Sequence, residues 1–181
     1  IGLLVVLFLA DIALGSVKIP FLNLISSIFS EQGAYTEILW QFRIPKALTC
    51  ILAGGALATA GLLMQSLFRN PMAGPDVLGL TSGASLMVAL VLLIGQLNPS
   101  LGSSVFQSPW SIALASSFGG VLVFILIIVI ANHIKENTSL LIIGLMISAA
   151  TSSIVSVLQF TSQADDLQTF IIWTLGSVGG T

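Results

Sequence analysis

Long hydrophobic stretches without charge, separated by short polar ones, dominate the sequence. A helix needs about 20 apolar residues to cross the hydrocarbon core of a bilayer. The interval Lys46–Arg69 has no charge between its ends, and Asp76–Lys135 carries His133 as its one titratable group. The second interval is too long for one helix, and residues 96–109 divide it with asparagine, glycine, serine and two prolines. The pattern predicts membrane-spanning helices near 47–68, 77–95, 110–131 and 139–160.

The two ends of the sequence add shorter segments. Residues 1–17 are interpreted as the remainder of a further span, which makes about five in all. Residues 18–41 contain an amphipathic stretch that is expected to lie along the membrane surface. Residues 166–175 are too short to span and are predicted to form a short re-entrant or interfacial helix. The predicted fold is an all-α, polytopic transmembrane helical bundle, with residues 1–181 as a single transmembrane domain that is truncated at both ends.

The composition supports a membrane location. Of the 181 residues, 56% are hydrophobic and 7% are charged, whereas soluble domains have about 25% charged residues. The five basic residues are scattered and the net charge is −2, which gives no footprint for nucleic acid. Cys50 is the single cysteine, so the chain has no internal disulfide, and it is expected to be a small core residue.

Charge does not decide the orientation in the membrane. If the predicted spans alternate in direction, Arg69 and Lys135 lie on one side and Lys18, Arg43 and Lys46 lie on the other. Two basic residues against three are too even for the positive-inside rule.

Small and hydroxylated residues recur at four-residue spacing in the last predicted span. Gly144, Ser148, Ser152 and Ser156 share one face of the helix 139–160. Small side chains let helices approach closely in lipid, while hydroxyl groups also suit a hydrated pathway. These four residues, called the α-helical stripe below, could therefore either pack against another helix or line a hydrated pathway, and both interpretations stay open.

Two polar segments between spans contain unusual residues. Arg69–Asp76 holds two prolines and a glycine, a composition typical of a positioned, non-helical turn. Arg43–Lys46 is predicted to open the span 47–68, with Pro45 in the first helical turn. Two cations at a helix N-terminus oppose the macrodipole. Either they extend to lipid phosphates, or they await an acidic partner.

The predicted complete spans contain no Asp, Glu, Lys or Arg. Ion-coupled carriers usually need such groups inside the membrane, so their absence counts against a proton- or sodium-coupled transporter. Asp165 and Asp166 pair at a span end, but no further ligand or base lies near them in the sequence, and no nucleophile–base set indicates an enzyme.

Several segments in order resemble the FecCD-type permeases, the membrane subunits of ABC importers for iron–siderophore complexes, haem and vitamin B12. The resemblance covers the whole chain, and its most specific part is the Asn-Pro-x-Ala-x-Pro turn. The similar segments are Arg43–Lys46, Gly61–Pro75, Leu78–Ala84, Thr138–Ser139 and Asp166–Gly180.

The resemblance implies a function and a set of partners. It implies a ten-span subunit in the bacterial cytoplasmic (inner) membrane that forms a homodimer. Two ABC ATPase subunits would bind ATP and Mg²⁺, so no cofactor is expected in this chain, and a substrate-binding protein would deliver the substrate. The alternative is a secondary transporter or channel that is not coupled to ATP.

The resemblance also implies roles for individual residues. Arg43 and Lys46 match positions that dock the binding protein. Asn70, Met72, Asn137 and Thr138 match a gate on the cytoplasmic side. The helix with Gly144, Ser148, Ser152 and Ser156 lines the pathway in that family, which favours the pathway interpretation of the stripe. No metal-ligating or catalytic residue is implied.

Overall fold

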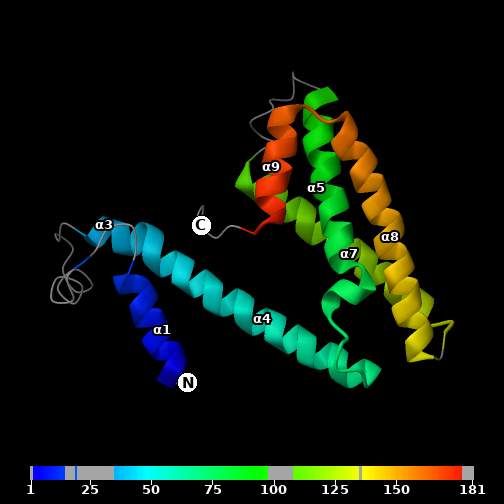
Figure 1. The fold of residues 1–181 in the computed structure, drawn as a ribbon, viewed down its shortest axis with the longest axis horizontal. Coiled ribbons are helices and arrows are strands. Elements are labelled where there is room, and N and C mark those ends of the chain that lie inside the picture. The colour runs from blue at the N-terminus through cyan, green and yellow to red at the C-terminus, as the bar shows by residue number, and fades with distance from the viewer. Residues whose placement is uncertain (1, 15–18, 20–34, 98–107, 135, 177–181) are drawn as a thin grey trace. The chain divides into compact units, whose positions relative to one another are not determined.

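The computed structural model describes residues 2–14, 19, 35–97, 108–134 and 136–176, and all regular structure within these ranges is helical (Figure 1). The predicted all-α class is confirmed for this part of the chain. The chain divides into two compact units, one reaching to Ala58 and the other comprising Thr59–Gly176. Each unit is described by itself below.

The first unit pairs a short helix with the start of a long one. Helix α1 covers Gly2–Ala13, and a continuous helical segment runs through α3 (Thr36–Ile38), the π-helical turn η1 (Leu39–Arg43) and α4 (Ile44–Phe68). Their shared core consists of buried apolar side chains, with Phe8, Ala13, Tyr35 and Ile44 packed around it. Its buried members are Ile12, Ile19, Leu39 and Ala47.

The predicted start of the second span is wrong. The helix begins at Thr36, so Pro45 and its neighbours lie inside a helix and not at its N-terminus. A proline inside a helix has no N–H to donate, and its ring collides with the carbonyl four residues earlier. The π turn lies directly before Pro45, and Ile44 N–H donates to Leu39 O, five residues back. This wider turn accommodates the proline without ending the helix. Because the helix begins at Thr36, Arg43 does not lie at its N-terminus and does not oppose the helix dipole there.

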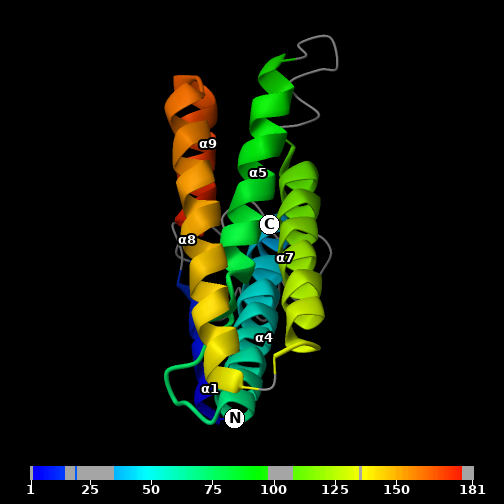
Figure 2. The same cartoon turned by 90° about the vertical axis from the view of Figure 1, so that its right-hand side faces the viewer.

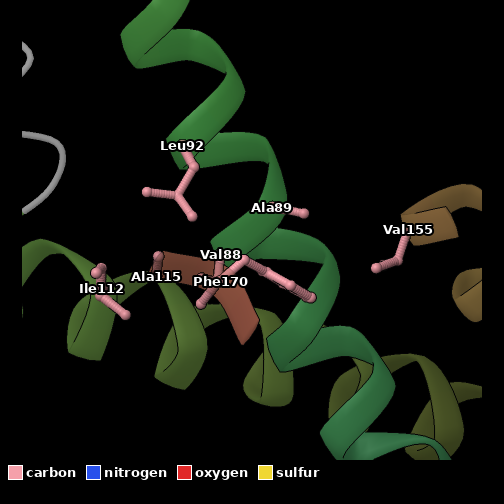
Figure 3. Close-up of a cluster of buried hydrophobic side chains, with 7 residues drawn as sticks. All are labelled: Val88, Ala89, Leu92, Ile112, Ala115, Val155 and Phe170. Carbon is pink, nitrogen blue, oxygen red and sulfur yellow. The ribbon is translucent and has the colours of Figure 1, made fainter. Parts of the chain in front are cut away.

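The second unit is a small bundle. It contains the 3₁₀ turn η2 (Pro75–Leu78) and helices α5 (Leu80–Leu97), α7 (Pro109–Ala131), α8 (Asn137–Thr161) and α9 (Ala164–Thr174). Helix α5 lies between α7 and α8 (Figure 2). Its residues Val88, Ala89 and Leu92 are buried among side chains from the three other helices (Figure 3). The remaining members of this cluster are Ile112, Ala115, Val155 and Phe170.

Local sequence signals explain several helix ends in this unit. Ser108 Oγ accepts a hydrogen bond from Ser111 N–H at 3.2 Å and caps α7, and Pro109 occupies its first turn. Asp165 and Asp166 lie in the first turn of α9, where negative charge suits the helix dipole. These ends fall within two residues of the predicted helices 110–131, 139–160 and 166–175.

The predicted helix 77–95 begins later than expected. Gly79 has φ +80°, in the left-handed region, and separates η2 from α5. Glycine adopts this conformation without steric cost. The predicted span therefore becomes a 3₁₀ turn, a glycine corner and a helix from Leu80.

Three helices in the described ranges are long and apolar enough to cross a membrane: Thr36–Phe68, Pro109–Ala131 and Asn137–Thr161. Gly2–Ala13 and Leu80–Leu92 are shorter apolar helices. Five spans within a single domain stay a prediction. The proposed surface segment 18–41 lies largely outside the described residues, and its last part, from Thr36, belongs to the long helix.

Two glycines allow α5 and α7 to approach closely. A Cβ added to Gly119 would contact the backbone oxygen of Gly83 and would lie 2.7 Å from Met87 Cγ. Small residues allow this kind of close helix contact in a membrane. Gly54, in the first unit, has open space around it in the described structure.

Candidate functional site

The turn after α4 is fixed by its own polar side chains. Asn70 Oδ1 accepts a hydrogen bond from Met72 N–H at 3.0 Å, the arrangement of an Asx turn. Gln65 Nε2 donates to Pro71 O at 2.9 Å, and Asn70 N–H donates to Gln65 O at 3.2 Å. Arg69 has φ +48°, which few residues other than glycine adopt. The prediction of a positioned turn is thus matched by a specific hydrogen-bonded structure.

This turn is joined to the first residue of α8. Asn137 Nδ2 donates to Leu67 O at 2.8 Å, across 70 residues of sequence. Leu67 O belongs to the last turn of α4, where carbonyls lack partners within their own helix. The structure therefore brings the start of α8 to the end of α4, directly before the Asn70 turn. The gate role of these residues stays a prediction.

The predicted gate residues differ in exposure. The Met72 side chain is 87% exposed, and Thr138 is also exposed. Beneath them lies a buried apolar cluster that anchors the turn to α7 and α8. Its buried members are Phe68, Ala73, Leu78, Ile127 and Leu140. The site thus presents an exposed, apolar Met72 side chain above a buried apolar cluster.

The 3₁₀ turn η2, which follows the Asn70 turn, packs directly against α8. A Cβ added to Gly144 would lie 2.5 Å from Val77 O and 2.8 Å from Leu78 Cα. A Cβ added to Gly79 would lie 3.0 Å from Ser148 Oγ. The absence of side chains at Gly79 and Gly144 is what allows the 3₁₀ turn to lie directly on α8.

The α-helical stripe therefore divides into two halves. Gly144 and Ser148 contact the segment 77–79, as the packing alternative expects. Ser152 and Ser156 are exposed, and Ser156 Oγ donates to Ser152 O at 3.0 Å. Ser148 Oγ is buried without a hydrogen-bond partner in the described part of the chain. The pathway role of the four residues stays a prediction, and the contacts with 77–79 give Gly144 and Ser148 a packing role.

Arg43 lies in the first unit and contacts α1. Its Nη1 donates to Ile12 O at 2.6 Å and to Ala13 O at 3.4 Å. Lys46 is exposed on the same long helix. The two predicted docking cations therefore have different surroundings: Arg43 binds the end of α1, and Lys46 faces outward.

The sequence did not single out Gly119 or the partner of Asn137. The Gly119–Gly120 pair inside an apolar run was the available signal for the first. No sequence signal links Asn137 to Leu67, because the bond depends on the tertiary fold. Among the described residues, no group of three or more His, Cys, Asp or Glu could hold a metal ion.

Comparison with known proteins gives one consistent family. Residues 3–181 match the model of the FecCD transport family. The chain is 32% identical over 178 residues to the hemin transport system permease protein HmuU of Yersinia pestis, covering 98% of this chain and 51% of that protein. It is 32% identical over 143 residues to the vitamin B12 import system permease protein BtuC of Klebsiella pneumoniae, covering 78% of this chain and 40% of that protein.

A solved structure shows the same fold. It is assigned to an inward-facing conformation of a metal-chelate type ABC transporter, with a TM-score of 0.74 and 24% sequence identity. The match covers 98% of this chain and 50% of the other. The chain thus spans about half the length of the relatives it matches, which are named as transport permeases and not as enzymes. Its apolar helices and these matches make it part of a multi-pass membrane protein, and the chain belongs to the FecCD transport family.

Proposed function

We propose that this chain is part of the permease subunit of an ABC importer. The observation that supports this proposal most strongly is the family match, which runs from residue 3 to residue 181 and so covers both units of the fold. The hydrogen-bonded Asn70 turn and its attachment to α8 support the proposal, because they build a defined structure at the predicted gate.

The proposed substrates are metal chelates or related large cofactors. The two relatives described above are named for hemin and for vitamin B12, and iron–siderophore complexes are the third class that the resemblance implies. A binding protein would deliver the substrate to a homodimer of permease subunits in the bacterial inner membrane. Two ATPase subunits would hold ATP and Mg²⁺ and drive the conformational change.

Each part of the site has a proposed role. Asn70, Met72, Asn137 and Thr138 form the gate on the cytoplasmic side, with Met72 as its exposed apolar contact. Ser152 and Ser156 line the pathway, since both side chains are exposed in this part of the chain. Lys46 and Arg43 receive acidic residues of the binding protein.

The alternative is a secondary transporter or channel that works without ATP. Helices α7 and α8 contain no Asp, Glu, Lys or Arg. Carriers coupled to protons or sodium usually place such residues inside the membrane. This absence in two long helices favours an external source of energy.

Uptake by cells tests the proposal and identifies the substrate class. A strain that lacks the full-length gene is complemented with it and supplied separately with haem, cobalamin and a panel of ferric siderophores. We expect the gene to restore uptake of at least one of these ligands by about tenfold or more, because large chelates do not cross a bilayer unaided. Restoration of none of them, with the protein present in the membrane, would contradict the proposal.

A further inference from the structure

A cavity of about 600 Å³ lies between α1 and α4 in the first unit. The two helices meet near η1, at their shared core, and diverge away from it (Figure 1). The volume is within the range of roughly 300–1,000 Å³ that is typical of ligand sites in proteins. The space between the helices is therefore large enough for a bound molecule.

One face of α1 lines this cavity. Residues spaced three or four apart lie on the same side of a helix. Leu3 is 73% exposed and Leu7 is 60% exposed, so the described part of the chain leaves this apolar face open. The residues of α1 that line the cavity are Leu3, Leu4, Leu7, Phe8 and Asp11.

The α4 wall of the cavity has small side chains. Gly54 and Gly55 line it, and nothing lies within 4 Å of a Cβ added to either residue. Cys50, which the sequence led us to expect in the core, is exposed on this wall one turn earlier. These positions leave room for a flexible apolar chain beside the leucines of α1.

The polar end of the cavity is formed by Asp11. It lies in the last turn of α1, whereas Leu3 and Leu4 lie in the first turn of this apolar helix. A charged side chain is costly at the centre of a bilayer, so it is expected near the headgroups when it occurs at the end of a membrane helix. The lining of the cavity thus follows the order of polarity in a phospholipid, from headgroup to acyl chain.

The charge of Asp11 indicates which headgroup suits the cavity. The described part of the chain gives its carboxylate no hydrogen bond or ion pair. An ionised carboxylate only accepts hydrogen bonds, and an ammonium group offers both N–H donors and the opposite charge. A quaternary ammonium has no N–H to donate, and an anionic headgroup is repelled. The best match is a primary ammonium.

We propose that this cavity binds a phospholipid with a primary ammonium headgroup. The ammonium donates to the carboxylate of Asp11, and an acyl chain lies between the leucines of α1 and the glycines of α4. The inference concerns a lipid of the surrounding membrane and not the transported substrate, so it does not depend on the proposed function.

Photolabelling of the full-length protein in nanodiscs tests the lipid site. The nanodiscs consist of phosphatidylcholine with a small fraction of phosphatidylethanolamine that carries a diazirine on an acyl chain. Label on peptides containing residues 3–11 and 50–55 is quantified by mass spectrometry. We expect about threefold more label from this lipid than from phosphatidylglycerol with the same acyl chains, the size of effect that one exposed ion pair gives. Equal labelling by the two lipids, or no label on these peptides, would overturn the proposal without any substitution.

Removal of one charge tests the role of Asp11. Asp11→Asn keeps the shape of the side chain, and we expect it to abolish the threefold preference for phosphatidylethanolamine. Asp165→Asn, which changes an exposed carboxylate in the first turn of α9, should keep the preference. A full preference in the Asp11 variant would show that this carboxylate does not select the headgroup.

Filling the cavity tests the position of the acyl chain. Gly54→Leu places a side chain in the space beside Leu7, and we expect label from both lipids on residues 3–11 to fall by roughly threefold or more. Gly61→Leu is the matched control, because Gly61 lies on the same helix, also has nothing within 4 Å of an added Cβ, and does not line the cavity. Its labelling should be unchanged. Equal labelling of the two variants, each present in the nanodiscs in the same amount, would contradict an acyl chain in this cavity.

Discussion

Replacing Gly144 with alanine is expected to lower the free energy of unfolding of the full-length protein by about 2–3 kcal/mol. The new methyl group would lie 2.5 Å from Val77 O and 2.8 Å from Leu78 Cα. Both neighbours are backbone atoms, so no side-chain rotation relieves the collision, and η2 must move away from α8. The measurement is unfolding of the purified protein in mixed detergent micelles, followed by circular dichroism.

A second glycine provides the control for Gly144→Ala. Gly74 lies just before η2, has φ −138°, and has nothing within 4 Å of its added Cβ. Gly74→Ala should therefore change stability by less than about 0.5 kcal/mol. Equal stability of the Gly144 and Gly74 variants would contradict the direct packing of η2 on α8.

The adjacent glycines of α7 should respond very differently to the same substitution. At Gly119 an added Cβ would collide with the backbone oxygen of Gly83 and would lie 2.8 Å from the carbonyl carbon of that residue. At Gly120 the nearest atom recorded is Leu80 O, at 3.8 Å, an ordinary van der Waals contact. We expect Gly119→Ala to cost about 2 kcal/mol. Gly120→Ala is expected to be neutral or slightly stabilising, because alanine has the higher helix propensity.

This pair tests the close approach of α5 and α7 with matched chemistry. Both variants add one methyl group to the same helix, so hydrophobicity and helix propensity change equally. Only the neighbour on α5 differs. Unfolding in mixed micelles should place the Gly119 variant well below the Gly120 variant, and the reverse order would refute the packing of α5 against α7 through Gly83.

The sequence predicted the long helices well because apolar length is a strong local signal. Helices α7 and α8 begin and end within two residues of the predicted ranges, since charged or polar residues and Pro109 mark their ends. The start of the second long helix was mispredicted because Pro45 is usually a helix-opening residue. Here a π turn accommodates it, and a π turn has no simple sequence signal.

The site was predicted in part. The turn at Asn70 could be expected from its prolines and asparagine, since these residues form turns through local hydrogen bonds. The division of the α-helical stripe could not, because four small residues at equal spacing look alike in sequence. Only the position of η2 distinguishes Gly144, which is buried, from Ser152, which is exposed. The contact of Arg43 with α1 likewise depends on a helix 31 residues away in the sequence.

A transport assay with the reconstituted protein tests most directly whether this chain belongs to an ATP-driven importer. The full-length protein is placed in proteoliposomes with its ATPase subunits, and the loaded binding protein and labelled substrate are added outside. ATP or a non-hydrolysable analogue is enclosed within the liposomes. An importer permease predicts accumulation of substrate only when ATP is hydrolysed. Equal accumulation with the analogue, or without the ATPase subunits, would contradict it and would support a channel or secondary transporter.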